Sequence, residues 1–196
     1  MIKIALIVGS TRPQRFADVP ARWIAQGASA RPDLRLETLD LRDHALPFYR
    51  EPMSPLASDG VYTDPAAEAW RRKIGEFDGY IATVAEYNHG PTAVLKNAFD
   101  SAYHEWNHKP IAFVGYGGAG GVRAIEHLRG VAVELQMAPI KAEVNIAMEP
   151  FLGILTQGKT LDDYEYLVKA RETLFDQLAW WGNALKAARE RRAEAA

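Results

Sequence analysis

The chain has 196 residues, of which 48% are hydrophobic and 24% are charged, an ordinary globular composition that excludes global disorder. Its formal net charge of -2 at pH 7 lacks the basic excess of a nucleic-acid-binding surface, so we expect no nucleic-acid partner. There are no cysteines, which excludes disulfides, thiol nucleophiles, thiolate zinc sites and iron–sulfur clusters. Any redox chemistry would therefore need a bound cofactor. The length fits one domain spanning 1–196.

No apolar run in the sequence approaches the length of a membrane span. The N-terminus begins a strand pattern within two residues and shows no basic-then-apolar signal segment. We therefore expect a soluble cytoplasmic protein with no membrane partner.

The first predicted strand leads directly into a candidate anion site. Ile2–Val8 is apolar at nearly every position, which is typical of a central strand buried on both faces. It runs into Gly9-Ser10-Thr11-Arg12-Pro13-Gln14-Arg15-Phe16, and a helical pattern follows over 16–29. Such a turn offers backbone N–H groups, hydroxyls and guanidiniums to an anion. An ordinary turn with a capping Ser or Thr is the alternative, but two arginines three residues apart favour a phosphate.

The remaining elements alternate between strands and helices. Strands are predicted over 34–39, 80–84, 111–114 and 140–146, and helices over 65–77, 92–106, 123–136 and from Thr160 onward. The last helix ends in a charged tail from about Arg189, which we expect to fray. Residues 147–159 are predicted as a short excursion. The segment 40–64 is interrupted by proline and glycine, which indicates a long loop that is either a lid or an oligomer contact.

This alternation predicts an α/β fold with a doubly wound, five-stranded parallel sheet between two helical layers. The two common arrangements are the flavodoxin-like strand order 2-1-3-4-5 and a truncated dinucleotide-binding fold. In either, ligands bind beyond the carboxyl ends of the strands where the winding direction reverses. The flavodoxin-like order would bring the Gly9 loop beside the loops 85–91 and 115–121. The Gly115-x-Gly117-x-x-Gly120 spacing is a weak dinucleotide signal, because it follows the fourth predicted strand.

Three motifs carry a family resemblance. Gly9-Ser10-Thr11-Arg12, Glu86-Tyr87-Asn88 and Leu95-Lys96-Asn97-Ala98-Phe99-Asp100 occur in the order and spacing of the NADPH-dependent FMN reductase family. The chain resembles this family from Met1 to about Ile146, including Glu105-Trp106-x-x-Lys109-Pro110, and the resemblance implies the flavodoxin-like fold. It departs at Ala85, where the family usually has proline, and at His89-Gly90, where a polar residue and a serine are common.

The resemblance implies a bound FMN and a set of residues that hold it. Ser10, Thr11, Arg12, Arg15 and Phe16 would surround the phosphate; Ala85, Glu86, Tyr87 and Asn88 would line the pyrimidine side of the ring; and Tyr116, Gly117 and Gly118 would flank the ring. No side chain is expected to act as a catalytic acid or base, because hydride transfer between nicotinamide and flavin needs none. Glu86 is therefore assigned to binding.

The implied activity is an NAD(P)H-dependent FMN or quinone reductase. NADPH or NADH would reduce the flavin, which would pass electrons to a small-molecule acceptor such as a quinone, an azo compound or free flavin. The resemblance also implies a homodimer or homotetramer, with the contact at 40–64 and at the helix from Thr92. The alternative is a non-enzymatic FMN-binding electron carrier or redox-sensing interaction module, and the near-neutral charge argues against the carrier.

A second motif points to a different chemistry. His104-Glu105-Trp106-Asn107-His108 matches the His-Glu-x-x-His helix of zinc hydrolases. That chemistry needs both histidines on one helix face and a third ligand. The residue before Pro110 disfavours helical geometry, so we expect His108 at or past the helix end. A zinc hydrolase using His104 and His108 is therefore a remote alternative, and no metal is predicted.

Overall fold

The computed structural model describes residues 1–58 and 60–194. The strands are β1 (Ile2–Val8), β2 (Leu34–Asp40), β3 (Gly79–Ala85), β4 (Pro110–Tyr116) and β5 (Ala138–Ile146). The helices are α1 (Asp18–Ser29), α2 (Pro65–Gly75), α3 (Ala93–Asp100), α4 (Val122–Glu134), α5 (Met148–Gln157) and α6 (Glu165–Glu194). Short 3₁₀ turns lie at Pro55–Ala57 and Leu161–Asp163.

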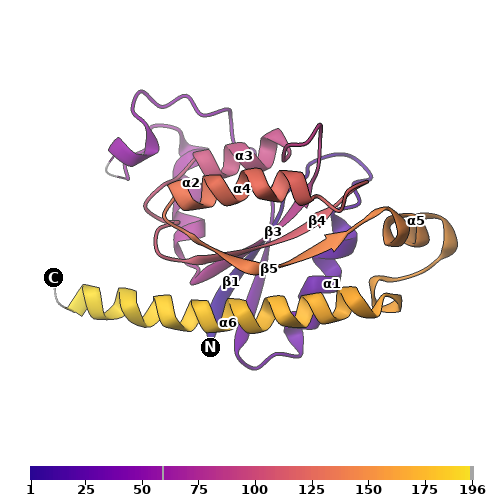
Figure 1. The fold of residues 1–196 in the computed structure, drawn as a ribbon. Helices are drawn as coiled ribbons and strands as arrows, with labels where there is room; N and C mark the ends of the chain where they lie inside the picture. The colour runs from indigo at the N-terminus through magenta and orange to yellow at the C-terminus, as the bar shows by residue number, and fades with distance from the viewer. Residues whose placement is uncertain (59, 195–196) are drawn as a thin grey trace.

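The five strands form one parallel sheet in the order β2-β1-β3-β4-β5, which confirms the predicted flavodoxin-like order. Helices α2, α3 and α4 cover one face of the sheet, and α1 and α6 cover the other (Figure 1). From β1 the chain first crosses to β2 on one side. It then returns to the other side of β1, where β3, β4 and β5 follow in order. The reversal therefore lies between β1 and β3, where ligands of such sheets bind.

Each face of the sheet has its own hydrophobic core, because successive side chains of a strand point to opposite faces. Within β1, Ile4 and Leu6 pack into the core shared with α1 and α6, whereas Ala5 and Ile7 pack into the core shared with α2, α3 and α4. This double burial explains why β1 is apolar at almost every position.

Aromatic side chains fill the core beneath α2 and α3. Trp106 is fully buried, and its ring centroid lies 4.6 Å from that of Tyr80 and 5.2 Å from that of Phe99. Trp106 lies in the turns that follow α3 and not in the helix itself. The predicted helix over 92–106 is therefore too long. The helix ends at Asp100, and the Ser101 hydroxyl donates to the Asn97 carbonyl at 2.7 Å. Such side-chain bonds compete with continued helix.

The C-terminal part differs from the predictions in two places. Residues 148–157, predicted as an excursion, form helix α5, and α6 does not fray at Arg189 but continues to Glu194. Arg189 holds the end of α6, because its guanidinium donates to the His108 carbonyl at 2.7 Å and pairs with Asp78 at 3.1 Å. No helix in the described part of the chain is both long and apolar enough to cross a membrane.

The outer strand β5 has side chains bonded to its exposed backbone. The Gln177 carboxamide oxygen accepts from the Ala142 N–H at 2.9 Å, and Arg129 donates to the Ile140 carbonyl at 2.8 Å. Arg129 also pairs with Glu143 at 2.6 Å. These contacts cover backbone groups that an edge strand would otherwise leave open to pairing with another strand.

Candidate functional site

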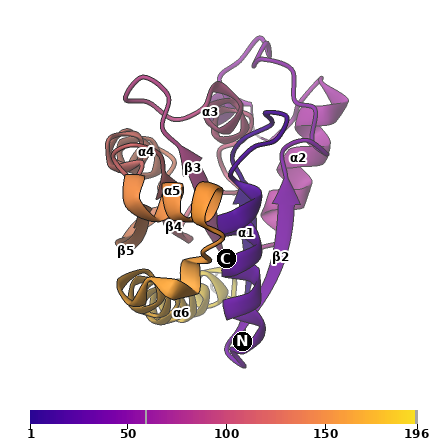
Figure 2. The same ribbon diagram turned by 90° about the vertical axis from the view of Figure 1, so that its right-hand side faces the viewer.

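A cavity of about 350 Å³ lies at the carboxyl ends of β1, β3 and β4, where the winding reverses. Helix α5 lies across this end of the molecule, between α1 and α4 (Figure 2). Nine of the twelve predicted residues line the cavity: Ser10, Arg12, Arg15, Phe16, Ala85, Glu86, Tyr87, Tyr116 and Gly117. Thr11 lines a neighbouring cavity instead, and Asn88 and Gly118 line neither.

The loop after β1 is anchored where it leaves the strand. Gly9 donates its N–H to the Thr83 hydroxyl at 3.0 Å and accepts from the Thr92 hydroxyl at its carbonyl. A Cβ at position 9 would lie 2.2 Å from the Thr83 carbonyl oxygen and 2.9 Å from Leu95. Only glycine fits there, and the loop is thereby fixed to both β3 and α3.

The same loop has donors available for an anion. In the described part of the chain, the backbone N–H groups of Thr11, Gln14 and Phe16 make no hydrogen bond to another residue. Gln14 adopts a left-handed conformation with φ 51°, which turns the chain ahead of α1. Ser10 is buried at the start of the loop. These groups suit a phosphate, which accepts several hydrogen bonds at a loop that leads into a helix.

The two arginines of the loop have different surroundings. The buried Arg15 guanidinium pairs with Asp18 at 2.6 Å and with both carboxylate oxygens of Asp40, and it donates to the Ser10 carbonyl. These carboxylates raise the pKa of Arg15, and they also balance its charge. Arg12 is exposed and forms no ion pair with another described residue. Arg15 therefore shapes the loop, while Arg12 offers uncompensated positive charge to a ligand.

The cavity also has aromatic walls. The Phe16 ring lies 5.4 Å from Tyr116 and 4.5 Å from Phe151, measured between centroids. Burial raises the pKa of the Tyr116 hydroxyl, so it stays protonated at neutral pH. Gly117 has φ 130°, a conformation that side-chain-bearing residues rarely adopt, and it leaves the wall beside Tyr116 open. These aromatic side chains suit a flat, apolar ring.

Four residues of the lining were not predicted from the sequence: Gln14, Val19, Phe151 and Leu155. Phe151 and Leu155 belong to α5, whose apolar positions Met148, Phe151, Leu152 and Leu155 follow the helical period. This spacing could have revealed the helix. Pro150 argued against a helix here, although proline is tolerated in the first turn of a helix, where it lies.

A tight hairpin follows Ala85 at the end of β3. The backbone N–H groups of Tyr87 and Gly90 each donate to the other residue's carbonyl, at 2.8 and 3.0 Å. The two residues between them, Asn88 and His89, have φ values of 51° and 70°. Positive φ at both central positions defines a type I′ turn, and asparagine tolerates it better than histidine does. The hairpin holds Tyr87 in the cavity wall.

Glu86 ties this hairpin to the start of α4. Its carboxylate accepts from the Arg123 side chain at 2.6 Å and from the Arg123 backbone N–H at 3.2 Å. Burial opposes ionisation, but the bonds from Arg123 outweigh it and lower the pKa of Glu86. Arg123 also lies 2.8 Å from the His89 ring nitrogen. Glu86 is therefore a charged anchor between two loops of the site, and it is ionised at neutral pH.

The His-Glu-x-x-His motif does not form a helical metal site. It lies in turns after α3, and His108 has φ 59°. The carboxylate of Glu105 pairs with Arg71 at 2.7 Å. No group of three histidine, aspartate or glutamate side chains in 1–58 or 60–194 is arranged to hold a metal. The zinc hydrolase alternative therefore has no support in the described structure.

Comparison with known proteins agrees with this geometry. The family model described as NADPH-dependent FMN reductase matches residues 2–150. The chain belongs to this family. An NAD(P)H-dependent FMN reductase of Schizosaccharomyces pombe is 39% identical over 135 residues, which cover 69% of this chain and 68% of that protein. An NADPH:quinone oxidoreductase of Arabidopsis thaliana is 33% identical over 170 residues, covering 83% and 84% of the two chains.

Solved structures support the fold of this family member. FerB, a flavoenzyme NAD(P)H:(acceptor) oxidoreductase from Paracoccus denitrificans, superposes with a TM-score of 0.72 at 21% identity, covering 94% of this chain and 98% of that one. The predicted family and the flavodoxin-like fold are confirmed. So is the predicted class: an NAD(P)H-dependent FMN reductase-type oxidoreductase that uses FMN.

Proposed function

We propose that the cavity between the loops after β1, β3 and β4 holds FMN, and that the enzyme transfers electrons from NADPH or NADH to a small acceptor. Quinones, azo compounds and free flavin are the acceptor classes. The observation that carries this proposal is the polarity of the cavity. Its lining combines the uncompensated charge of Arg12 and unpaired backbone N–H groups with the aromatic rings of Phe16, Tyr116 and Phe151.

The loop 9–16 would bind the phosphate. The hydroxyls of Ser10 and Thr11 and the backbone N–H groups can donate to phosphate oxygens, and the Arg12 guanidinium matches them with its planar fork. Each such charge-assisted bond contributes about 1.5–3 kcal/mol, so a few suffice for tight retention. Arg15 would act on the loop itself, because its donors are engaged by Asp18, Asp40 and the Ser10 carbonyl.

The other two loops would hold the ring. Ala85, Glu86 and Tyr87 line the cavity after β3, and Tyr116 and Gly117 line it after β4, whereas Asn88 and Gly118 lie outside the lining. The Glu86–Arg123 pair fixes the loop after β3 relative to α4. The rings of Phe16 and Phe151 lie 4.5 Å apart between centroids and would shield a bound ring from water.

FMN, when bound, supplies the group that accepts a hydride from the nicotinamide and passes electrons to the acceptor. The protein has to place this group and keep competing water away from it. No side chain of the lining needs to move a proton, and Glu86 is held ionised by Arg123. This is consistent with Glu86 being a binding residue.

The test is to add FMN to the purified protein and follow the flavin spectrum. NADPH or NADH consumption is then measured with excess quinone and with limiting protein. We expect stoichiometric flavin binding and many turnovers per protein molecule. A protein that gains no flavin spectrum would overturn the proposal. One that binds FMN but does not consume nicotinamide over repeated turnovers would support the electron-carrier or sensor alternative.

We also propose that the enzyme is a homodimer. The segment 41–64 exposes four large apolar side chains, Phe48, Met53, Leu56 and Val61. The ribbon of this segment runs beside α2 and α3 (Figure 1). Exposed apolar side chains gathered in one segment are typical of a protein–protein contact. Sedimentation of the wild type and of Phe48→Asp with Leu56→Asp tests this. We expect a dimer and a monomer respectively, and a monomeric wild type would contradict the proposal.

A further inference from the structure

Helix α5 has an apolar stripe on its exposed side. Met148, Leu152 and Leu155 are 48%, 43% and 57% exposed. Their spacing places them one above the other on one face of the helix. At about 3.6 residues per turn, Phe151 follows on one flank of these side chains and the polar Thr156 on the other. We call Met148, Leu152 and Leu155 together the α5 stripe.

The α5 stripe is continuous with the cavity proposed to hold FMN. Leu155 belongs to both, because it lines the cavity and is also exposed. Phe151 lines the cavity from the same helix. At the other end of the stripe, the Met148 methyl carbon lies 3.5 Å from the position of a Cβ built on Gly118, which directly follows the lining residue Gly117. The apolar surface therefore extends from the cavity lining out onto α5.

The α5 stripe suits an uncharged chain. It runs over about 10 Å, since seven steps of helix at about 1.5 Å each separate Met148 from Leu155. Glu149 is the one charged residue of α5, and it lies about a quarter-turn away from the stripe. Exposed apolar surface beside a ligand cavity is typical of a ligand groove. An aliphatic chain gains from burial there, whereas the polar ribityl chain of free flavin or a charged azo compound does not.

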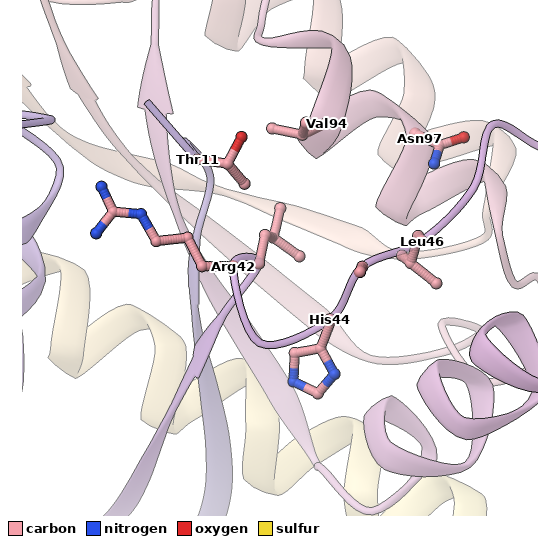
Figure 3. Close-up of a pocket in the computed structure, with 8 residues that line it drawn as sticks. Thr11, Arg42, His44, Leu46, Val94 and Asn97 are labelled. Carbon is pink, nitrogen blue, oxygen red and sulfur yellow. The ribbon is translucent and has the colours of Figure 1, made fainter. Parts of the chain in front are cut away.

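A second cavity, also of about 350 Å³, adjoins the phosphate loop but is not continuous with the first. Its wall is mostly apolar, and the Arg42 guanidinium is turned away from the side chain of Val94 (Figure 3). Among the described residues, the two cavities share no lining residue, and Thr11 of the phosphate loop lines the second one. A chain attached to a ring in the flavin cavity would have to cross this loop to enter the second cavity, whereas it meets Leu155 directly.

We infer that the α5 stripe binds the aliphatic tail of an acceptor whose flat ring enters the flavin cavity. The preferred acceptor is accordingly a quinone with an isoprenoid or alkyl side chain. The inference rests on the proposed function, because the quinone ring must accept electrons in the flavin cavity. Leu152 and Leu155 lie beyond 2–150, the segment that the family model matches, so this preference comes from a helix outside the matched pattern.

The test measures quinone binding to the FMN-loaded enzyme by calorimetry, without nicotinamide. The probes are three benzoquinones with the same ring and no side chain, one isoprene unit or two isoprene units. We expect the first isoprene unit to lower the Kd about tenfold, because each fully buried methylene tightens binding about fourfold. Met148→Ser combined with Leu152→Ser should remove most of this gain and change the Kd of the unsubstituted quinone less than twofold. The kcat/KM values should follow the same pattern.

Two single variants are controls. Val133→Ser replaces an exposed apolar residue near the end of α4 that lies away from Glu86, and it should leave the gain unchanged. Val94→Phe should fill the second cavity and also leave the gain unchanged. Loss of the gain in Val94→Phe would place the tail in the second cavity and overturn the inference.

Three other results would also overturn it. They are equal Kd values for the three quinones, an unchanged gain in the double variant, and a wild-type dimer that the double variant dissociates in sedimentation. The last result would mean that a second copy of the chain covers the stripe. The proposed function fails separately, through absent FMN binding or absent nicotinamide oxidation with the unsubstituted quinone.

Discussion

Arg12 and Arg15 lie in the same loop, and their different partners give them different roles. Arg15 is buried and balanced by Asp18 and Asp40, whereas Arg12 is exposed and has no ion pair with a described residue. The sequence predicts both as phosphate contacts, because it shows their spacing but not their partners. Asp40 lies 25 residues away and reaches Arg15 only because β2 pairs with β1.

The first prediction concerns Arg12. We expect Arg12→Ala to raise the Kd for FMN about tenfold to a hundredfold, because at least one charge-assisted bond of about 1.5–3 kcal/mol is lost. Titration of the flavin-free protein with FMN, followed by fluorescence quenching, measures it. His104→Ala is the control, since His104 is exposed after α3 and far from the lining. Equal effects of the two variants would contradict the assignment.

At the scale of elements, α5 is the part of the site that sequence reasoning missed. The loops after β1, β3 and β4 could be placed together because strand order alone brings their ends to one edge of the sheet. No such rule places a helix that follows the last strand. Its position depends on packing: the Gly153 backbone approaches the Tyr164 ring so closely that a Cβ there would lie 2.0 Å from the hydroxyl oxygen.

The second prediction concerns this helix. We expect Phe151→Ala to weaken FMN binding about tenfold, equivalent to about 1.4 kcal/mol, because the aromatic wall loses its contact with Phe16. The same fluorescence titration measures it. Leu152→Ala is a matched control, because Leu152 is exposed on α5 and does not line the cavity. If both variants bind FMN like the wild type, α5 is not part of the binding site.

At the scale of the whole molecule, strand order was predictable and chain ends were not. Alternating strands and helices with right-handed crossovers leave few arrangements, which is why the order 2-1-3-4-5 could be anticipated. The straight course of α6 to Glu194 could not, because Asp78 and His108, which hold Arg189, are distant in sequence. Residues 195–196 of the tail predicted to fray lie outside the described structure.

The third prediction concerns global stability and pH. Lys109 is buried beside α2 and β3, where its ammonium donates to the Gly75 carbonyl at 3.1 Å and to the Tyr80 hydroxyl at 3.2 Å. Burial, assisted by Arg189 and opposed by Asp78 and Glu105, lowers the pKa of Lys109 to about 8 from 10.5. Between pH 8 and pH 10.5, Lys109 is mostly protonated in the unfolded chain and mostly neutral in the folded protein. The free energy of unfolding that depends on Lys109 therefore rises with pH over this range.

Urea denaturation from pH 7 to pH 10.5 measures this effect. We expect the wild type to gain up to about 3 kcal/mol relative to Lys109→Met over that range, since each unit of pKa difference contributes about 1.4 kcal/mol. Taking the difference between the two proteins removes the contribution of other titrating groups. A difference that stays constant, or that falls with rising pH, would contradict the buried, depressed lysine.

The side chains bonded to β5 also bear on how the protein behaves when it is concentrated, tagged or redesigned. A strand from another molecule could extend the sheet at β5 only after displacing Gln177 from Ala142 and Arg129 from Ile140. Amyloid-like stacking through this edge is therefore disfavoured in the folded state. Substitution of Arg129 or Gln177 would remove this cover and leave backbone groups of β5 open to pairing with another strand.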